Sequence, residues 1–128
     1  MGDLSKHFSR SEFSCRGTDC DCKGTFNTVD TELLRILEAI RAHFDRPITV
    51  NSGCRCLDHN AAVGGAMPTD GVGGSQHLYG RAADIVVDGI SPGLVYELAD
   101  QMGIGGAGKY SSFTHVDSRT NGPARWGS

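Results

Sequence analysis

The segment AADIVV at residues 82–87 decides the fold, because it is the clearest β-strand in a sequence otherwise rich in turn residues. Upstream of it, residues 57–80 are expected to be mostly loop, since they contain many glycines and Pro68. Asp84 interrupts the apolar run of the strand. An isolated buried carboxylate is costly, so Asp84 must be paired, hydrogen-bonded or bound to a metal ion.

Two helices are expected, one before this strand and one after it. The first has apolar residues at helical spacing with charged residues between them, namely Leu33, Ile36, Leu37, Ile40 and Phe44. Thr28 is its expected N-cap, and residues 45–47 end it. The second begins at Ser91-Pro92, with the serine as N-cap and the proline in the first turn, and ends at Gly103.

Two further short strands are expected, at residues 48–50 and around residues 113–117, the latter after a glycine-rich turn over residues 103–108. Helices and short strands in mixed order are typical of an α+β fold. At 128 residues the chain is expected to form a single domain. We divide it into a cysteine-containing N-terminal cap at residues 1–27 and a core at residues 28–128.

The composition argues against some classes of function. The net charge is −3 and the lysines and arginines are scattered, which argues against binding of nucleic acid or of an acidic membrane surface. No apolar run approaches the roughly 20 residues of a membrane span, and the N-terminus lacks the pattern of a signal sequence. We expect a soluble monomer, made in the cytoplasm, that reaches an external target by another route.

Two histidines and two aspartates form the candidate site. His77 lies in a glycine-flanked loop before Asp84, and strand alternation puts His115 and Asp117 on one face of their strand. Two histidines and one aspartate suit a catalytic zinc site with one open position. Zinc there would activate a water molecule and polarise a carbonyl group. Arg55, which follows a strand and a turn, would hold an oxyanion or a substrate carboxylate.

Each of these residues also has a simpler interpretation. A His-Val-Asp sequence is common by chance and often marks an ordinary strand end. Asp84 could bind backbone amides, and Arg55 could form a surface ion pair. The spacing alone therefore indicates a metal site without deciding it.

The order of the motifs resembles that of the D-Ala-D-Ala metallopeptidases of the peptidase M15 family. Four elements carry the resemblance: Ser52-Gly53-Cys54-Arg55, then Asn60 with Val63-Gly64-Gly65, then Ser75 to Asp84, then His115 to Asp117. The opening Phe8 to Phe13 and the closing Pro123 to Trp126 are similar to the small phage-associated branch. The family includes zinc D-Ala-D-Ala carboxypeptidases and phage endolysins that cut cell-wall peptides.

The resemblance implies one catalytic zinc ion on His77, Asp84 and His115. It implies that Arg55 stabilises the polarised carbonyl or anchors substrate, and that Ser75 contacts substrate. The implied fold is the small α+β fold shared with the hedgehog signalling domain, in which a central antiparallel sheet flanked by helices holds the metal.

The chain departs from the family at the general base. Many relatives place the base three residues before the last zinc ligand, or a histidine two residues before it; here those positions are Ser112 and Phe113. Asp117 is the nearest carboxylate on the ligand face, so it is the candidate base. The competing role for Asp117 is to orient His115, and both roles stay open.

The five cysteines cannot all pair with one another; they are Cys15, Cys20, Cys22, Cys54 and Cys56. One interpretation is one or two disulfides between the N-terminal cap and the loop that carries Arg55. Another is a second, structural zinc on four cysteines, although the spacings are not the usual C-x2-C. Either arrangement would brace the wall of the site. A cysteine nucleophile lacks an evident histidine partner.

The resulting hypothesis is a zinc peptidase that acts on peptidoglycan stem peptides or cross-bridges containing D-amino acids. A phage or prophage endolysin fits a chain without a signal sequence, and both carboxypeptidase and endopeptidase action remain open. The alternative is a zinc-containing binding module of the same fold that has lost turnover. The absence of an acid at Ser112 favours this alternative, whereas Arg55 and Ser75 oppose it.

Overall fold

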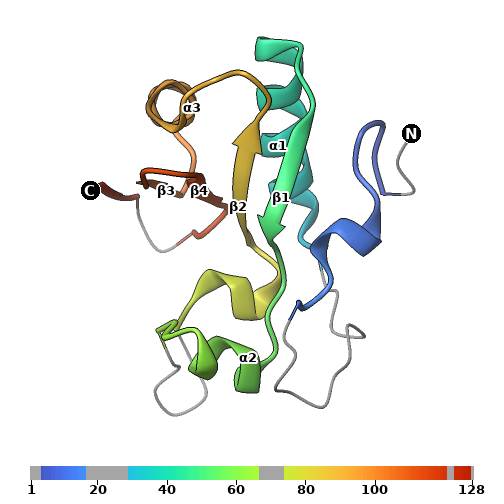
Figure 1. Ribbon diagram of the computed structural model, residues 1–128, viewed down its shortest axis with the longest axis vertical. Helices are drawn as coiled ribbons and strands as arrows, with labels where there is room; N and C mark the ends of the chain where they lie inside the picture. Colours follow the sequence, from blue (N-terminus) through green and yellow to red (C-terminus); the bar gives the residue numbers. More distant parts are fainter. Residues whose placement is uncertain (1–3, 17–28, 67–73, 121–122, 128) are drawn as a thin grey trace.

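The computed structural model describes residues 4–16, 29–66, 74–120 and 123–127 (Figure 1). Its helices are η1 (Arg10–Phe13), α1 (Thr31–Phe44), α2 (Leu57–Ala62), η2 (Gln76–Tyr79) and α3 (Pro92–Met102). Its strands are β1 (Ile48–Ser52), β2 (Ala82–Val87), β3 (Gly106–Lys109), β4 (Thr114–Asp117) and β5 (Ala124–Gly127). The expected α+β class is confirmed. None of the described helices is long and apolar enough to cross a membrane.

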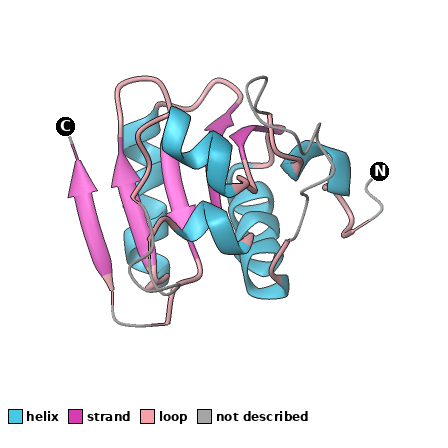
Figure 2. Ribbon diagram, turned by 90° about the horizontal axis from the view of Figure 1, so that it is seen from below, coloured by secondary structure: helices cyan, strands magenta, loops and turns pink. Residues whose placement is uncertain are grey.

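The strands form one five-stranded sheet in the order β1-β2-β4-β3-β5. Each of the pairs β1–β2, β2–β4 and β3–β4 is antiparallel, as expected, whereas β5 lies parallel to β3 and makes the sheet mixed. Figure 2 shows the strands side by side, with the C-terminal strand at the edge. The segment AADIVV is β2, and it lies inside the sheet between β1 and β4.

The core lies on one face of this sheet. Alternate residues of β2 (Ala83, Ile85 and Val87) join it, because successive side chains of a strand point to opposite faces. The helices α1 and α3 cover this face with the apolar residues Leu33, Ile36, Leu37, Ile40, Val95 and Ala99. Figure 1 shows α1 behind β1 and β2. Asp84, between Ala83 and Ile85, therefore belongs to the opposite face, where the site is.

The two long helices, α1 and α3, are capped in different ways. The N-cap of α1 is Asp30, while the expected cap, Thr28, lies outside the described residues. The Asp30 carboxylate does not cap the helix but accepts a 2.7 Å hydrogen bond from the Ser118 hydroxyl, which ties α1 to the end of β4. The helix α3 begins and ends as expected, with Ser91 as N-cap and Gly103 at its C-terminal end in the left-handed conformation (φ 71°).

Two segments expected to be loop or mostly loop contain regular structure. Residues 57–80 contain the helices α2 and η2, and the glycine-rich segment 103–108 contains the first part of β3. The strand β5 was not expected at all. Glycine is a poor strand former, so β3 exists because β4 and β5 both pair with it. The N-terminal cap, where described, is less polar than expected, since Phe8 and Phe13 are buried in the core.

Candidate metal centre

One row of residues crosses the whole sheet and passes through the site. Asp84 in β2 is the register partner of Ser52 in β1 and of His115 in β4. In turn, His115 is the partner of Gly108 in β3, and Gly108 is the partner of Trp126 in β5. Residues of one row point to the same face. The sheet therefore aligns two of the candidate ligands, Asp84 and His115, without any loop.

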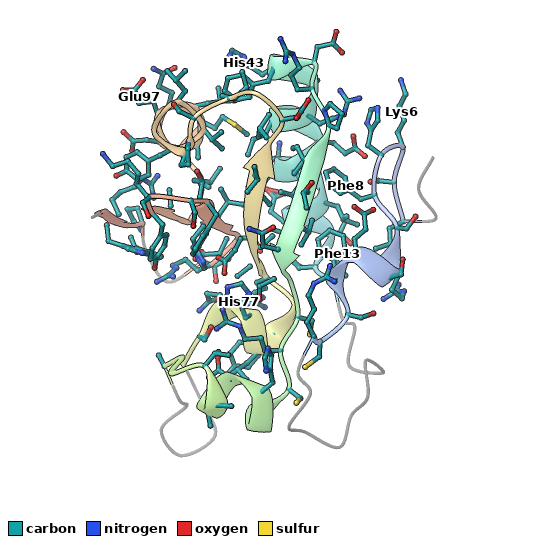
Figure 3. The ribbon with its side chains drawn as sticks, viewed as in Figure 1. Lys6, Phe8, Phe13, His43, His77 and Glu97 are labelled. Atoms are coloured by element: carbon teal, nitrogen blue, oxygen red, sulfur yellow. The ribbon has the colours of Figure 1, made fainter. Side chains whose placement is uncertain are left out.

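The third candidate ligand, His77, comes from η2. The Ser75 hydroxyl accepts a hydrogen bond from the His77 backbone N–H at the start of this turn, and Gly80 ends it with a positive φ of 67°. Figure 3 shows His77 between the sheet and α2. The ligand atoms of His77, Asp84 and His115 all lie within 4.8 Å of one another, and all three residues are buried. They are the only such group of three among the described residues.

Hydrogen bonds orient both histidine rings. His77 Nδ1 lies 2.6 Å from the carbonyl oxygen of Gly53, which only accepts, so Nδ1 carries the hydrogen and Nε2 offers a lone pair. His77 Nε2 lies 3.3 Å from Asp84 Oδ1. In His115, Nε2 faces Asp117 Oδ2 at 2.7 Å, and Nδ1 faces the same Asp84 oxygen at 3.0 Å. A nitrogen from each ring thus meets one carboxylate oxygen.

This donor set fits a zinc ion. Two imidazole nitrogens and one carboxylate oxygen are the ligands of many catalytic zinc sites. Burial opposes the charged form of Asp84, but hydrogen bonds with His115 and His77 outweigh it and hold the pKa of Asp84 well below its usual range. Burial lowers the pKa of His115, but Asp117 and Asp84 outweigh it and raise the pKa. The buried carboxylates therefore favour a positive charge beside them, and a divalent cation can supply it.

Asp117 lies behind His115 and is fully buried. Arg119 binds it in a bidentate way, with Nε 2.9 Å from Oδ1 and Nη2 2.7 Å from Oδ2. Burial opposes ionisation, yet the bonds from His115 and Arg119 hold the pKa of Asp117 well below its usual range. Gly106, its register partner in β3, has no side chain, and a Cβ atom there would overlap the carboxylate. Asp117 is thus a hydrogen-bond partner on the far ring nitrogen of His115.

Arg55 is fixed above the site by three acceptors. Its Nε donates to Ser52 Oγ (3.3 Å), its Nη1 to Asn60 Oδ1 (3.2 Å) and its Nη2 to Asp84 Oδ2 (3.5 Å). Asn60 is fully buried and also donates from Nδ2 to the carbonyl oxygen of Ala66 at 3.0 Å. Asn60 was noted only as part of a motif; the structure gives it the role of connecting Arg55 to the next loop.

A cavity of about 420 Å³ opens over the candidate ligands. Ser75 lines it, and its backbone N–H donates to Ala66 O at 2.8 Å; its contact with substrate stays a prediction. The described lining consists of Arg55, Gly64, Gly65, Ala66, Gly74, Ser75, Gln76, His77, Asp84, Tyr110, Phe113, His115, Arg119 and Trp126. All the predicted site residues except the buried Asp117 therefore meet at one cavity.

An aromatic wall, formed by Tyr110, Phe113 and Trp126, was missed by the sequence analysis. The rings of Tyr110 and Phe113 are stacked with centroids 4.4 Å apart, and Trp126 Nε1 donates to the Tyr110 hydroxyl at 2.8 Å. The indole also contacts His115, with ring centroids 4.9 Å apart. Strand alternation places Phe113 on the ligand face with His115, which was the available signal; Tyr110 gave none.

Two cysteines meet beside the site. Cys15 Sγ, just after η1, lies 3.7 Å from Cys56 Sγ, next to Arg55. This contact joins the N-terminal cap to the loop of Arg55, but no disulfide links the two cysteines, so the disulfide interpretation stays a prediction. Cys54 is buried, and Cys20 and Cys22 lie outside the described residues, as does any structural zinc on them.

Comparison with known proteins identifies a family. The sequence model of the family described as Peptidase M15 matches residues 6–117. The zinc D-Ala-D-Ala carboxypeptidase of Streptomyces albus G is 48% identical over 50 residues, which are 38% of this chain and 17% of that protein. The chain thus aligns with only about a sixth of the length of this curated relative.

Proposed function

Because this chain belongs to the peptidase M15 family, we propose that it is a zinc peptidase that cleaves peptide bonds in bacterial cell-wall peptidoglycan. The observation that carries the proposal is the convergence of His77, Asp84 and His115 in a cavity that also contains Arg55. The relative from Streptomyces albus G is by name a D-Ala-D-Ala carboxypeptidase, which supports a stem peptide or cross-bridge containing D-amino acids as substrate. Release to the wall in the manner of an endolysin is part of this proposal.

In this proposal the metal ligands and Arg55 have separate roles. Zinc, when bound to His77, Asp84 and His115, supplies an activated water and polarises the scissile carbonyl. Arg55 has five N–H groups, of which three serve Ser52, Asn60 and Asp84. The other two have no acceptor among the described residues and can bind a substrate carbonyl oxygen or carboxylate. Because its acceptors hold the guanidinium in place, Arg55 binds substrate without losing much conformational freedom.

We assign Asp117 the role of orienting His115 rather than that of general base. Both of its oxygens are already engaged by His115 and Arg119, and none of its surface is exposed. A carboxylate on the far nitrogen of a metal-binding histidine fixes the tautomer and strengthens the ligand. In this role Asp117 keeps the hydrogen on Nε2 and the lone pair of Nδ1 directed at the metal position.

A second candidate function, a zinc-containing binding module without turnover, rests on one observation. Asp84 is the only carboxylate among the described residues that line the cavity, and it is also a candidate ligand. None of these lining residues is therefore a spare carboxylate for the proton transfer that hydrolysis requires.

One experiment separates the two candidates. Zinc per chain is measured by elemental analysis on the wild type, on His77→Ala and on His43→Ala, an exposed histidine of α1, as control. Purified peptidoglycan is then incubated with each protein, with and without chelator, and released peptides and free D-alanine are identified by mass spectrometry. The peptidase proposal expects chelator-sensitive release by wild type and His43→Ala only. Zinc binding without release from a broad panel of walls supports the binding module, and equal zinc in His77→Ala contradicts the site.

A further inference from the structure

Three contacts hold Tyr110 in place. It lies in the turn between β3 and β4, where its backbone N–H donates to the carbonyl oxygen of Phe113 at 3.1 Å. Its ring is stacked on Phe113 with an angle of 16° between the planes. Its hydroxyl group is fixed by Trp126. The backbone hydrogen bond, the ring stacking and the bond from Trp126 together fix the position of the phenol oxygen.

The bond to Trp126 determines what the hydroxyl can still do. The indole Nε1–H only donates, so Tyr110 Oη is the acceptor in this 2.8 Å bond. A tyrosine hydroxyl has one hydrogen of its own to donate. The described structure places no protein acceptor on that hydrogen. One lone pair of Tyr110 Oη therefore accepts the bond from Trp126, and the O–H hydrogen remains available to donate to a bound ligand.

The cavity is where that group would lie. Tyr110 lines the same cavity as the candidate ligands, and Trp126 connects its hydroxyl to the ring of His115. Arg55 lines this cavity as well. Two donors, one cationic and one neutral, thus face the space above the metal position.

We propose that Tyr110 is a catalytic residue whose hydroxyl donates a hydrogen bond to the carbonyl oxygen of the scissile bond as negative charge develops on it. The inference rests on the peptidase function proposed above. No proton is transferred, because the hydroxyl keeps its hydrogen throughout. A pre-positioned donor of this kind acts mainly on the transition state, and removal of one costs about 10²–10³ in kcat.

The test replaces the hydroxyl alone. Tyr110→Phe keeps the ring that stacks on Phe113, and Tyr96→Phe, on the half-buried face of α3, is the matched control. With a D-Ala-D-Ala peptide as substrate, we expect kcat of Tyr110→Phe to fall about 100-fold, with KM within about threefold and zinc content unchanged. Trp126→Phe, which removes the orienting N–H, should lose less, about tenfold.

A second readout does not depend on turnover. Calorimetry measures the affinity of each variant for a phosphinate analogue of the peptide, whose anionic oxygens resemble the transition state, and for the cleaved product peptide. We expect Tyr110→Phe to lose about 100-fold for the analogue and less than threefold for the product. Equal losses for both ligands, or a kcat within threefold of wild type, would overturn the role of Tyr110. A wild type that neither cleaves the peptide nor binds the analogue would overturn the peptidase proposal as well.

Discussion

The indole of Trp126 lies directly on Gly108, its register partner across the parallel pair β3–β5. A Cβ atom at Gly108 would overlap the five-membered and six-membered rings of the indole. On its other side Gly108 pairs with His115, whose ring contacts Trp126. The missing side chain at Gly108 therefore lets an edge strand reach over the sheet and contact a candidate metal ligand.

Gly108→Ala should displace Trp126 and so disturb Tyr110 and His115, which the indole contacts. The added methyl group forces the indole away, which breaks its bond to Tyr110 and its contact with His115. We expect the free energy of unfolding to fall by about 1–3 kcal/mol, as for other overpacked sites. Denaturant titration measures this, with peptide release as second readout.

The control for this change is Gly93→Ala in α3. Its nearest neighbour would be Lys109 at 3.9 Å, and alanine favours a helix, so stability should stay the same or rise by up to about 1 kcal/mol. If Gly108→Ala were as stable and as active as Gly93→Ala, the contact between Trp126 and His115 would be unimportant.

Asp117→Asn distinguishes the two roles considered for Asp117. If it orients His115, the affinity for zinc should fall about 10- to 100-fold, because the amide can turn its N–H toward the ring and disfavour the binding tautomer. Competition with a chromogenic chelator measures this affinity. Asp100→Asn, which alters the half-exposed pair with Arg125, is the control. Unchanged zinc affinity together with lost turnover would instead support Asp117 as the general base.

The local pattern of the sequence was enough to predict the helices and the strand with clear apolar spacing or clear end signals. The spacing of apolar residues gave α1, the Ser91-Pro92 start and Gly103 end gave α3, and the apolar run at residues 82–87 gave β2. The shared face of Asp84 and His115 could also be predicted, since alternation in β4 and the buried charge of Asp84 point to one face of the sheet, whereas His77 comes from η2, to which strand alternation does not apply.

The aromatic wall could not be predicted in the same way. Trp126 reaches Tyr110 because β5 pairs parallel to β3, and no local pattern encodes that pairing. Gly106 and Gly108 are typical of a turn, yet they form a strand because Asp117 and Trp126 need the space that a side chain would fill. Here tertiary contacts outweigh the local preference of glycine.

Asn60→Ala should loosen Arg55 and the loop next to it. The substitution removes the acceptor of Arg55 Nη1 and one of the two hydrogen bonds to the carbonyl oxygen of Ala66, which keeps the bond from the Ser75 backbone N–H. We expect a loss of about 1–3 kcal/mol in the free energy of unfolding and a rise in KM of up to about tenfold. Asn51→Ala, at an exposed position of β1, is the control and should change neither. An unchanged KM for Asn60→Ala would mean that Arg55 does not need this support.

The stability of the N-terminal cap should depend on pH through Glu38. Burial raises the pKa of Glu38, but hydrogen bonds from Ser5 and His7 outweigh it, so the pKa lies below its usual value. A lowered pKa stabilises the fold above the pKa of the unfolded chain, and this contribution is lost as the pH falls through the lower, folded value. Glu38→Gln should therefore cost about 1 kcal/mol at pH 7 and much less at acid pH.

Thermal unfolding of wild type and Glu38→Gln, measured from pH 7 down to acid pH, checks the prediction. Glu97→Gln, exposed on α3, is the control. A difference between wild type and Glu38→Gln that stayed constant down to acid pH would contradict the role of the charge.

Cys15 and Cys56 should form a disulfide when the protein is exposed to a small-molecule disulfide such as oxidised glutathione. Their sulfur atoms are 3.7 Å apart, so a small rotation brings them to bonding distance. Two thiols are then oxidised and one glutathione disulfide is reduced to two thiols. The cysteines are 41 positions apart, and closing a loop of that length stabilises a fold by about 4 kcal/mol in the chain-entropy model.

Peptide mapping after alkylation of the remaining thiols identifies the bond, and thermal unfolding with and without reductant measures its effect. Cys54→Ser, which leaves both partners in place, should behave as wild type in the mapping. Cys56→Ser should lose the bond and the dependence on reductant. A disulfide mapped to Cys54, Cys20 or Cys22 instead would show that the contact between Cys15 and Cys56 does not set the pairing.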